Sequence, residues 1–129
     1  MNPTEERSLD AIYQHRLIEG SLSFQRCGDD HAVFPPRPAC PTCGSRDLVW
    51  LDAGPEATIY SSTTIAPRNA APYTVVILDV DDGFRMMSRL DGDDATKARI
   101  GDRVRIDIRP LTEDGAPLPC ATLIQAVAA

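Results

Sequence analysis

Two cysteines separated by two residues, Cys40 and Cys43, constrain the fold of this chain more than any other feature. The segment reads Cys40-Pro-Thr-Cys43-Gly44, and this spacing lets two thiolates meet one ion while the backbone turns beneath it. Gly44 stands where such a tight turn needs a residue that tolerates positive φ. A third cysteine, Cys27, lies upstream, beyond a proline-rich stretch. The pattern predicts a loop folded around a metal ion.

The metal that this donor set favours is zinc, which prefers four tetrahedral ligands drawn from cysteine sulfur and histidine nitrogen. Cys27, Cys40 and Cys43 supply three of them. The fourth is either His31 or Asp30, and Asp30 stands where a second C-x-x-C cysteine would fall. We expect a structural Zn2+ bound by Cys27, His31, Cys40 and Cys43, with Asp30 as the alternative fourth ligand. The competing reading is a loop held by its strands and prolines without the ion.

The sequence gives little sign of an independent active site. It contains no G-x-S-x-G, P-loop or HExxH motif. No strand–helix–strand pattern surrounds Cys40 and Cys43, so a thioredoxin-like redox pair is not favoured. Cys120 lies on the last predicted strand, and we expect it to be a buried core thiol. Without a nucleophile and a base at suitable spacing, we expect no catalytic residues.

Charge and composition narrow the classes of partner. The chain has 129 residues, a net charge of −6 and one lysine, Lys97. Binding to a phosphate backbone depends on lysine and arginine, so we expect no nucleic-acid partner. No apolar run approaches the roughly 20 residues of a membrane span, and the polar residues 1–10 do not resemble a signal peptide. We therefore expect a cytoplasmic protein without membrane contact, in which cysteines serve as metal ligands rather than in disulfides.

The distribution of apolar residues divides the chain into three parts. Residues 5–20 predict a helix with one apolar stripe, formed by Leu9, Ile12, Tyr13, Leu17 and Ile18. Residues 21–26 predict a strand that leads into a proline-rich connector. Further strands are predicted at 56–66, 73–80, 84–90, 103–110 and 118–127. We expect a mainly β protein, with an N-terminal helix over 1–22, a zinc-ribbon-like module over 23–50 and a five-stranded Greek-key OB-fold barrel over 51–129.

Three features bear on how these parts fit together. The N-terminal helix either docks on its own domain or also docks on a partner, because a small ribbon offers it little support. Trp50 is expected to pack between the ribbon and the barrel. The segments Asp81-Asp82-Gly83 and Glu113-Asp114-Gly115 predict turns between strands.

The order of these parts resembles the DUF35 family. The resemblance rests on "IEGSLSFQRC", "FPPRPACPTCGS", "ATIYSSTTI", "APYTVVILDVDDGFRMMSRL" and "ARIGDRVRI", which together cover roughly residues 10 to 127. The FPPRP-x-C-P-x-C-G stretch is its most specific part. The resemblance implies a rubredoxin-like zinc ribbon joined to an OB-fold, with Cys27, Cys40 and Cys43 at metal-ligand positions. Asp30 and His31 occupy the place of the family's second cysteine.

The resemblance also implies a function. Members of the family look like noncatalytic partners of thiolase-like acyltransferases, hydroxymethylglutaryl-CoA synthases, thiolase-type aldolases and MaoC-like hydratases. They are thought to bridge subunits, to complete an active site or to help hold the acyl-CoA. We therefore expect an accessory subunit of such an enzyme. The alternative is a stand-alone CoA-ester binding module, for which Arg37, Arg68 and Arg85 are weak candidates to contact phosphates. An OB-fold nucleic-acid binder is a weaker alternative.

Overall fold

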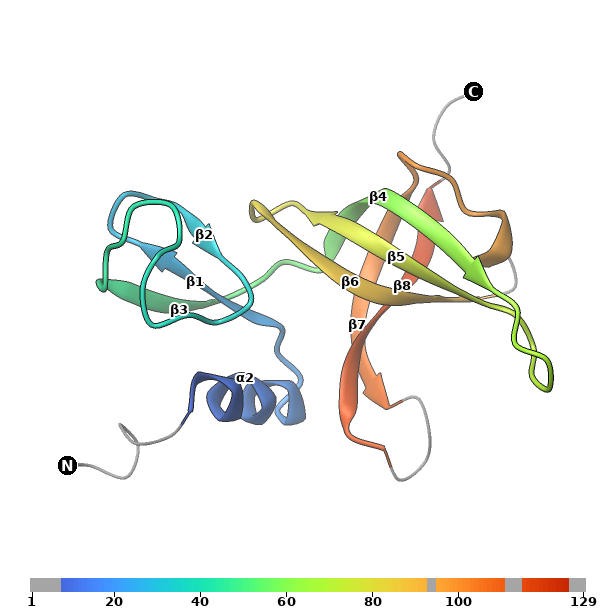
Figure 1. Cartoon of the computed structure of the whole chain (residues 1–129), viewed down its shortest axis with the longest axis horizontal. Helices are drawn as coiled ribbons and strands as arrows, with labels where there is room; N and C mark the ends of the chain where they lie inside the picture. Colours follow the sequence, from blue (N-terminus) through green and yellow to red (C-terminus); the bar gives the residue numbers. More distant parts are fainter. Residues whose placement is uncertain (1–7, 93–94, 111–114, 126–129) are drawn as a thin grey trace.

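A computed structural model describes residues 8–92, 95–110 and 115–125 of the chain. It consists of one helix, a three-stranded sheet and a closed five-stranded barrel. The helix and the small sheet lie beside each other at one end of the molecule, and the barrel forms the other end (Figure 1). The expected mainly β architecture, with a ribbon-like module ahead of an OB-type barrel, is confirmed.

The helix α2 (Leu9–Ile18) is capped at both ends. Its N-cap residue Ser8 accepts a hydrogen bond from the Ala11 N–H at 3.0 Å. At the other end Gly20 has φ +92°, and its N–H donates to the Leu17 carbonyl at 2.9 Å. The predicted residues 5–7 lie outside the described residues. In the described part of the chain, no helix has the length and apolar character needed to cross a bilayer.

The predicted apolar stripe of this helix is only partly correct. Leu17 is 1% exposed and belongs to the main core, and Tyr13 packs against that core. Ile18 is 67% exposed, so its assignment to the stripe was wrong. It is adjacent to Leu17 in the sequence, and consecutive residues in a helix point about 100° apart.

The three-stranded sheet has the order β2-β1-β3, with both outer strands antiparallel to the central one. Its strands are β1 (Ser23–Cys27), β2 (Ala32–Val33) and β3 (Leu48–Asp52). Of these, only β1 was predicted. The proline-rich connector is tied to this sheet because the buried Gln25 side chain accepts a hydrogen bond from the Arg37 N–H at 2.7 Å.

The barrel strands follow the order β4-β5-β6-β8-β7, and β7 pairs with β4 to close the barrel. The strands are β4 (Glu56–Ile65), β5 (Tyr73–Val80), β6 (Phe84–Asp91), β7 (Arg103–Pro110) and β8 (Pro117–Gln125). Only β6 and β8 run parallel. The connection between β6 and β7 contains the 3-10 helix η1 (Ala95–Lys97). Of the two predicted turns, the one at Gly83 is present, and residues 113–114 lie outside the described residues.

Phenylalanine side chains join the ribbon to the barrel. Phe84, at the start of β6, stacks on Phe34 with ring centroids 4.8 Å apart and contacts Phe24 at 5.0 Å. The turn between β5 and β6 adds polar contacts, because the Asp82 carbonyl accepts from Arg26 Nη2 at 3.0 Å. Trp50 does not occupy this junction. It lies on β3 and faces α2, so the expected position of Trp50 was wrong.

Candidate metal centre

Four side chains meet at the end of the ribbon that lies away from the phenylalanine junction. The Sγ atoms of Cys27, Cys40 and Cys43 and a ring nitrogen of His31 all lie within 4.8 Å of one another. Cys27 Sγ is 3.3 Å from His31 Nδ1 and 3.7 Å from Cys43 Sγ, and Cys40 Sγ is 3.8 Å from His31 Nδ1. The structure therefore brings together the four residues that the sequence predicts as ligands.

Two tight turns position these side chains. In the first, the Asp30 N–H donates to the Cys27 carbonyl at 3.0 Å, and Asp30 has φ 70°. In the second, the Gly44 N–H donates to the Cys40 carbonyl at 2.7 Å, and Gly44 has φ +76°. Glycine adopts this conformation without strain, and aspartate tolerates it better than most residues. The sequence therefore supplies suitable residues at the bends of both turns.

The donor atoms fit a tetrahedral zinc ion. With bonds of about 2.3 Å to sulfur and about 2.0 Å to nitrogen, tetrahedral geometry separates two sulfurs by about 3.8 Å and a sulfur from a nitrogen by about 3.6 Å. The observed S–S distance of 3.7 Å and S–N distances of 3.3 and 3.8 Å agree with this geometry. Thiolate and imidazole donors also suit zinc rather than calcium or magnesium.

The alternative ligand Asp30 points elsewhere. Its Oδ1 atom lies 3.3 Å from Arg26 Nη1, and its side chain is 87% exposed. It is not among the four residues whose donor atoms converge. The positive φ of Asp30 makes the bend that returns the chain to His31. Asp30 thus shapes the turn, and the geometry favours His31 as the fourth donor.

The thiols of this cluster do not share the same tendency to ionise. Burial raises the pKa of Cys40, but hydrogen bonds from the backbone amides of Cys43 and Thr42 outweigh it, and the pKa falls to about 6. The backbone hydrogen bond from Ser45 lowers the pKa of Cys43, but burial and the nearby Cys40 and Cys27 raise it to about 11. One thiolate therefore forms readily while a second is opposed, and a bound cation would remove this repulsion.

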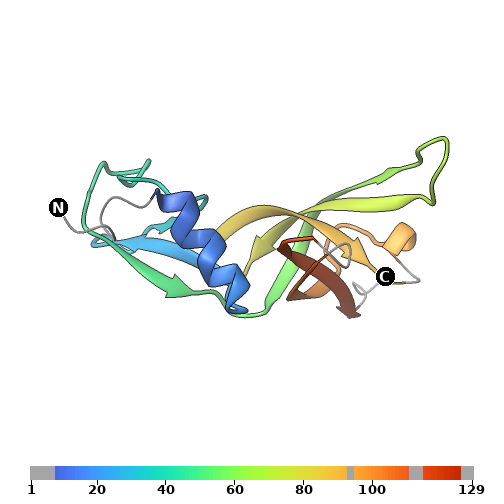
Figure 2. The same ribbon diagram turned by 90° about the horizontal axis from the view of Figure 1, so that it is seen from below.

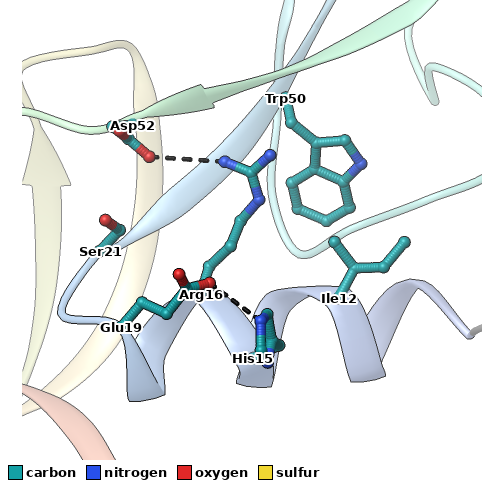
Figure 3. A pocket seen from close by; sticks show the side chains of 7 residues that line it. All are labelled: Ile12, His15, Arg16, Glu19, Ser21, Trp50 and Asp52. Atoms are coloured by element: carbon teal, nitrogen blue, oxygen red, sulfur yellow. Dashed lines mark ion pairs between the residues drawn. The ribbon is translucent and has the colours of Figure 1, made fainter.

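A surface groove lies between α2 and β3, and the sequence did not predict it. The groove has a volume of about 550 Å³, and its walls include Ile12, Arg16 and Trp50 (Figure 3). The Arg16 guanidinium lies 5.5 Å from the centre of the Trp50 ring and 3.6 Å from Asp52. His15 pairs with Glu19 at 3.0 Å on the exposed face of the helix. The groove is open and holds paired charges, which is not the arrangement of a nucleophile with a base.

The candidate arginines for a CoA phosphate lie on three separate elements. Arg37 is in the proline-rich connector of the ribbon, Arg68 is in the 66–72 connection between β4 and β5, and Arg85 is on β6. The ribbon and the 66–72 connection are at opposite ends of the molecule (Figures 1 and 2). The structure does not bring the three arginines together, and their role toward phosphates stays a prediction. Cys120 is 1% exposed on β8, as expected of a core thiol.

Comparison with known proteins places the chain in a family. Residues 10–49 match the family model "ChsH2, rubredoxin-like zinc ribbon domain", and residues 50–109 match "ChsH2, C-terminal OB-fold domain". A "DUF35 domain-containing scaffold protein" of Methanothermobacter thermautotrophicus is 31% identical over 110 residues, which cover 81% of this chain and 80% of that protein. The chain belongs to the DUF35 family. A DUF35 scaffold protein of Pyrococcus furiosus is 26% identical, over 79% of this chain and 77% of its own length.

Three further similar proteins are a hydratase subunit, a chain of an aldolase and another DUF35 structure. A "Probable enoyl-CoA hydratase alpha subunit" of Thermomonospora curvata is 31% identical over 76% of this DUF35 chain, but the chain spans only 31% of that relative's length. A solved chain of "Ltp2-ChsH2(DUF35) aldolase" superposes with a TM-score of 0.77 at 27% identity, covering 95% of this chain and 98% of that one. A DUF35 structure from Sulfolobus solfataricus, 14% identical with a TM-score of 0.65, confirms the fold; it covers 90% of this chain and 85% of that one.

Proposed function

We propose that this DUF35 chain is a noncatalytic accessory subunit of an acyl-CoA enzyme, either a thiolase-superfamily enzyme such as an acyltransferase or aldolase, or a MaoC-like hydratase. The observation that carries the proposal is the likeness, over nearly the whole length of both chains, to a chain of an Ltp2-ChsH2(DUF35) aldolase. The names of the DUF35 relatives, which are called scaffold proteins, support a noncatalytic role. In this role the chain bridges enzyme subunits and helps to hold the substrate.

The proposed metal has a structural task. Cys27, His31, Cys40 and Cys43 would hold one Zn2+, which would supply only a tetrahedral cross-link between the two turns of the ribbon. Four protein ligands would leave no open coordination position. A catalytic zinc requires such a position for water or substrate. The helix over 1–22, the ribbon over 23–50 and the OB-fold over 51–129 remain our proposed division of the chain.

The residues of the chain suit a rigid scaffold. Phe24 and Phe34 of the ribbon pack on Phe84 of the barrel, and one core cluster contains buried residues from the helix, the ribbon and the barrel. Two modules joined in this way keep a fixed relative orientation, because a packed core resists deformation. A partner that touches both modules would therefore meet a preformed surface.

Co-expression with candidate enzymes tests the proposal. The chain is produced together with each thiolase-like, aldolase or hydratase subunit encoded beside its gene, and the purified assemblies are weighed by native mass spectrometry. We expect a mixed complex with one of these subunits, and a higher turnover of that subunit in the complex than alone. A chain that stays monomeric with every candidate would contradict the proposal.

The alternative, a stand-alone CoA-ester binding module, makes a different prediction. It requires the isolated chain to bind an acyl-CoA without an enzyme subunit. Calorimetric titration of the isolated chain with acetyl-CoA and with a long-chain acyl-CoA measures this directly. We expect no saturable binding, because Arg37, Arg68 and Arg85 lie on separate elements and form no common phosphate site.

A further inference from the structure

The outer face of strands β5 and β6 carries an unusual set of side chains. Along β5 the residues Thr74, Val76, Leu78 and Val80 point into the barrel and are buried. The alternate residues therefore point outward, and they include Val75 and Ile77. On β6, Met87 lies opposite Ile77 and Arg89 lies opposite Val75. We call the following outward residues the β5–β6 face: Tyr60, Tyr73, Val75, Ile77, Asp79, Arg85, Met87, Arg89 and Leu118.

This face is more apolar than a solvent-facing strand surface requires. Met87 is 69% exposed, Tyr60 is 48% exposed and Leu118 is 39% exposed. In an antiparallel barrel with one solvated side, the outward positions normally carry polar residues. A contiguous apolar patch with polar groups at its edge is typical of an interaction site.

A small apolar cavity lies within the face. It has a volume of about 250 Å³ and is lined by Val75, Met87 and Leu118 together with Ser88, Arg89, Pro119 and Cys120. It forms where β6 and β8 are not joined, because their parallel ladder begins only at Arg89 and Cys120. Pro119, the residue before Cys120, has no N–H to extend the ladder. The cavity is smaller than the usual 300 to 1,000 Å³ of small-molecule pockets, so it suits a single inserted side chain, roughly of leucine size.

Two arginines and Asp79 carry the charge of the face. The Arg85 guanidinium lies 3.8 Å from the centre of the Tyr60 ring, and the Arg89 guanidinium lies 5.0 Å from that of Tyr73. Arg85 Nε lies 3.8 Å from Asp79 and Arg89 Nε lies 3.5 Å from Asp91, so each arginine already faces one carboxylate of this chain. Toward the described residues, the terminal nitrogens of both arginines make no hydrogen bond. They are therefore available to carboxylates of a partner, which arginine binds in bidentate fashion.

We propose that the β5–β6 face is the surface through which this chain docks on its enzyme subunit, and that the subunit presents an apolar side chain ringed by carboxylates. Tyrosine, methionine and arginine are enriched in protein interfaces, and lysine, glutamate and aspartate are depleted there. Of the three depleted types the face carries one residue, Asp79, which lies opposite Arg85. The inference rests on the proposed function and adds the surface and the chemistry of the partner.

A nucleic acid is the competing occupant, since OB-folds use the face of their second and third strands for oligonucleotides. The chain has a net charge of −6, which opposes a polyanion. The rings of Tyr60 and Tyr73 are each covered by an arginine, so those ring faces are not free for base stacking. These observations argue against a nucleic acid. The terminal nitrogens of Arg85 and Arg89, which make no hydrogen bond to the described residues, favour a protein partner that places carboxylates beside them.

The substitution Met87→Asp tests the docking surface. The probe is the enzyme subunit that co-purifies with the wild-type chain, and binding is measured by biolayer interferometry. We expect Met87→Asp to weaken binding about 30-fold or more, as loss of a central interface residue does. The matched control is Ile100→Asp, because Ile100 is 67% exposed and lies outside the face, before β7. The control should change binding less than about twofold, and thermal unfolding checks that both variants fold.

The outcomes separate this inference from the proposed function. Binding that Met87→Asp leaves unchanged would overturn the docking surface and leave the accessory role intact. Failure of the wild-type chain to bind any candidate subunit would overturn both. Equal weakening by Met87→Asp and Ile100→Asp would also contradict a specific face.

Charge reversal tests the chemistry of the partner. We expect Arg85→Glu and Arg89→Glu each to slow association about tenfold at low salt and to reduce its salt dependence, because complementary charge acts mainly on the association rate. The control is Lys97→Glu in η1, outside the face, which should have little effect. A fluorescent oligo(dT) probe is measured in parallel. Saturable oligo(dT) binding that is lost in both arginine variants, with subunit binding unaffected, would overturn the proposal in favour of a nucleic acid.

Discussion

The two ends of the ribbon are stabilised in different ways. At the end near the barrel, Phe24 packs on Phe84 and belongs to the large buried core of the molecule. At the other end, the buried cluster consists only of Cys27, Val33 and Cys40, with Leu48 packed against it. Two of these three buried residues are also donors of the candidate metal centre. So small a cluster buries little apolar surface, which is the situation in which small modules depend on a metal or a disulfide.

The barrel has a large apolar core, so it does not need a metal or a disulfide for its stability. Leu78 and Val104 are fully buried, and Ile59 and Val76 are 1% exposed. The four cysteines are free thiols, so no disulfide stabilises the chain. In our proposal the distal end of the ribbon depends on zinc, whereas the barrel depends on apolar burial.

Removal of the metal should give the largest difference between the distal end of the ribbon and the barrel. Treatment with a zinc chelator should increase amide exchange of β2 and of the Cys27 end of β1 at least about 100-fold, because in our proposal the metal would supply most of the order there. Exchange at buried positions of β5 and β6 should change little. Hydrogen–deuterium exchange of the chain before and after chelation measures both. Equal loss of protection in ribbon and barrel would break the comparison.

A cavity in the barrel should affect stability without affecting the metal. Leu78 is 0% exposed, and Leu78→Ala should lower the free energy of unfolding by about 2–5 kcal/mol. The control Ile100→Ala, at a surface position, should cost less than about 0.5 kcal/mol. Urea denaturation measures the stability, and zinc content below the transition should be unchanged. Loss of zinc from folded Leu78→Ala would show that the two regions are not independent.

The phenylalanine junction should contribute a smaller coupling between the modules. Phe34 and Phe84 stack with centroids 4.8 Å apart. We expect a coupling free energy of about 1 kcal/mol, the usual range for aromatic pairs, from a double-mutant cycle of Phe34→Leu and Phe84→Leu. The measurement is urea denaturation of the wild type, the two single variants and the double variant. Additive effects of the two substitutions would argue that the modules are not coupled through these rings.

The smallest effect is expected at an exposed ion pair of the barrel. Hydrogen bonds from Arg103, at 2.7 and 2.8 Å, lower the pKa of Asp81 below its usual value. A lowered folded-state pKa gives stability that is present above the unfolded pKa of about 3.9 and is lost as pH falls through the folded pKa.

Asp81→Asn should remove this acid dependence and cost about 0.5 kcal/mol at neutral pH, because the Asp81 side chain is 53% exposed and screened by solvent. Urea denaturation between pH 2 and 7 measures the difference. Asp79→Asn is the control, since Asp79 is equally exposed and its contact with Arg85 is longer, at 3.8 Å. A steeper acid dependence in Asp81→Asn than in the wild type would contradict the assignment.

The barrel could be predicted from the sequence because its strands are long and regular. In β7, Val104 and Ile106 alternate with exposed or half-exposed charged residues, and β5 and β6 are joined by a recognisable glycine turn. The sequence of the ribbon carries fewer signals for its strands. β2 has only two residues next to a proline-rich stretch, and β3 has no alternating pattern that distinguishes it from a connector. Pairing with β1 makes both segments into strands, and that pairing is a tertiary effect.

The convergence of the four candidate donors could be expected from their spacing, whereas the β5–β6 face and the groove beside Trp50 could not. The C-x-x-C motif and the upstream Cys27 and His31 are local signals, and the turns that unite them contain Gly44 and Asp30 at positive φ. The β5–β6 face depends on which strand positions point outward, and the groove beside Trp50 depends on how α2 docks on β3. Such features require the register of strands and the packing of elements, which composition and spacing do not contain.

The measurement that tests the metal-dependent ribbon most directly is the zinc content of three forms of the chain by native mass spectrometry. We predict one zinc in the wild type and in Asp30→Ala. In His31→Ala the affinity should fall by more than about 100-fold, since even outer-shell partners of a zinc ligand contribute 10- to 100-fold. A folded wild-type chain without zinc would contradict the account. Zinc retained in His31→Ala but lost in Asp30→Ala would contradict the assignment of the fourth ligand.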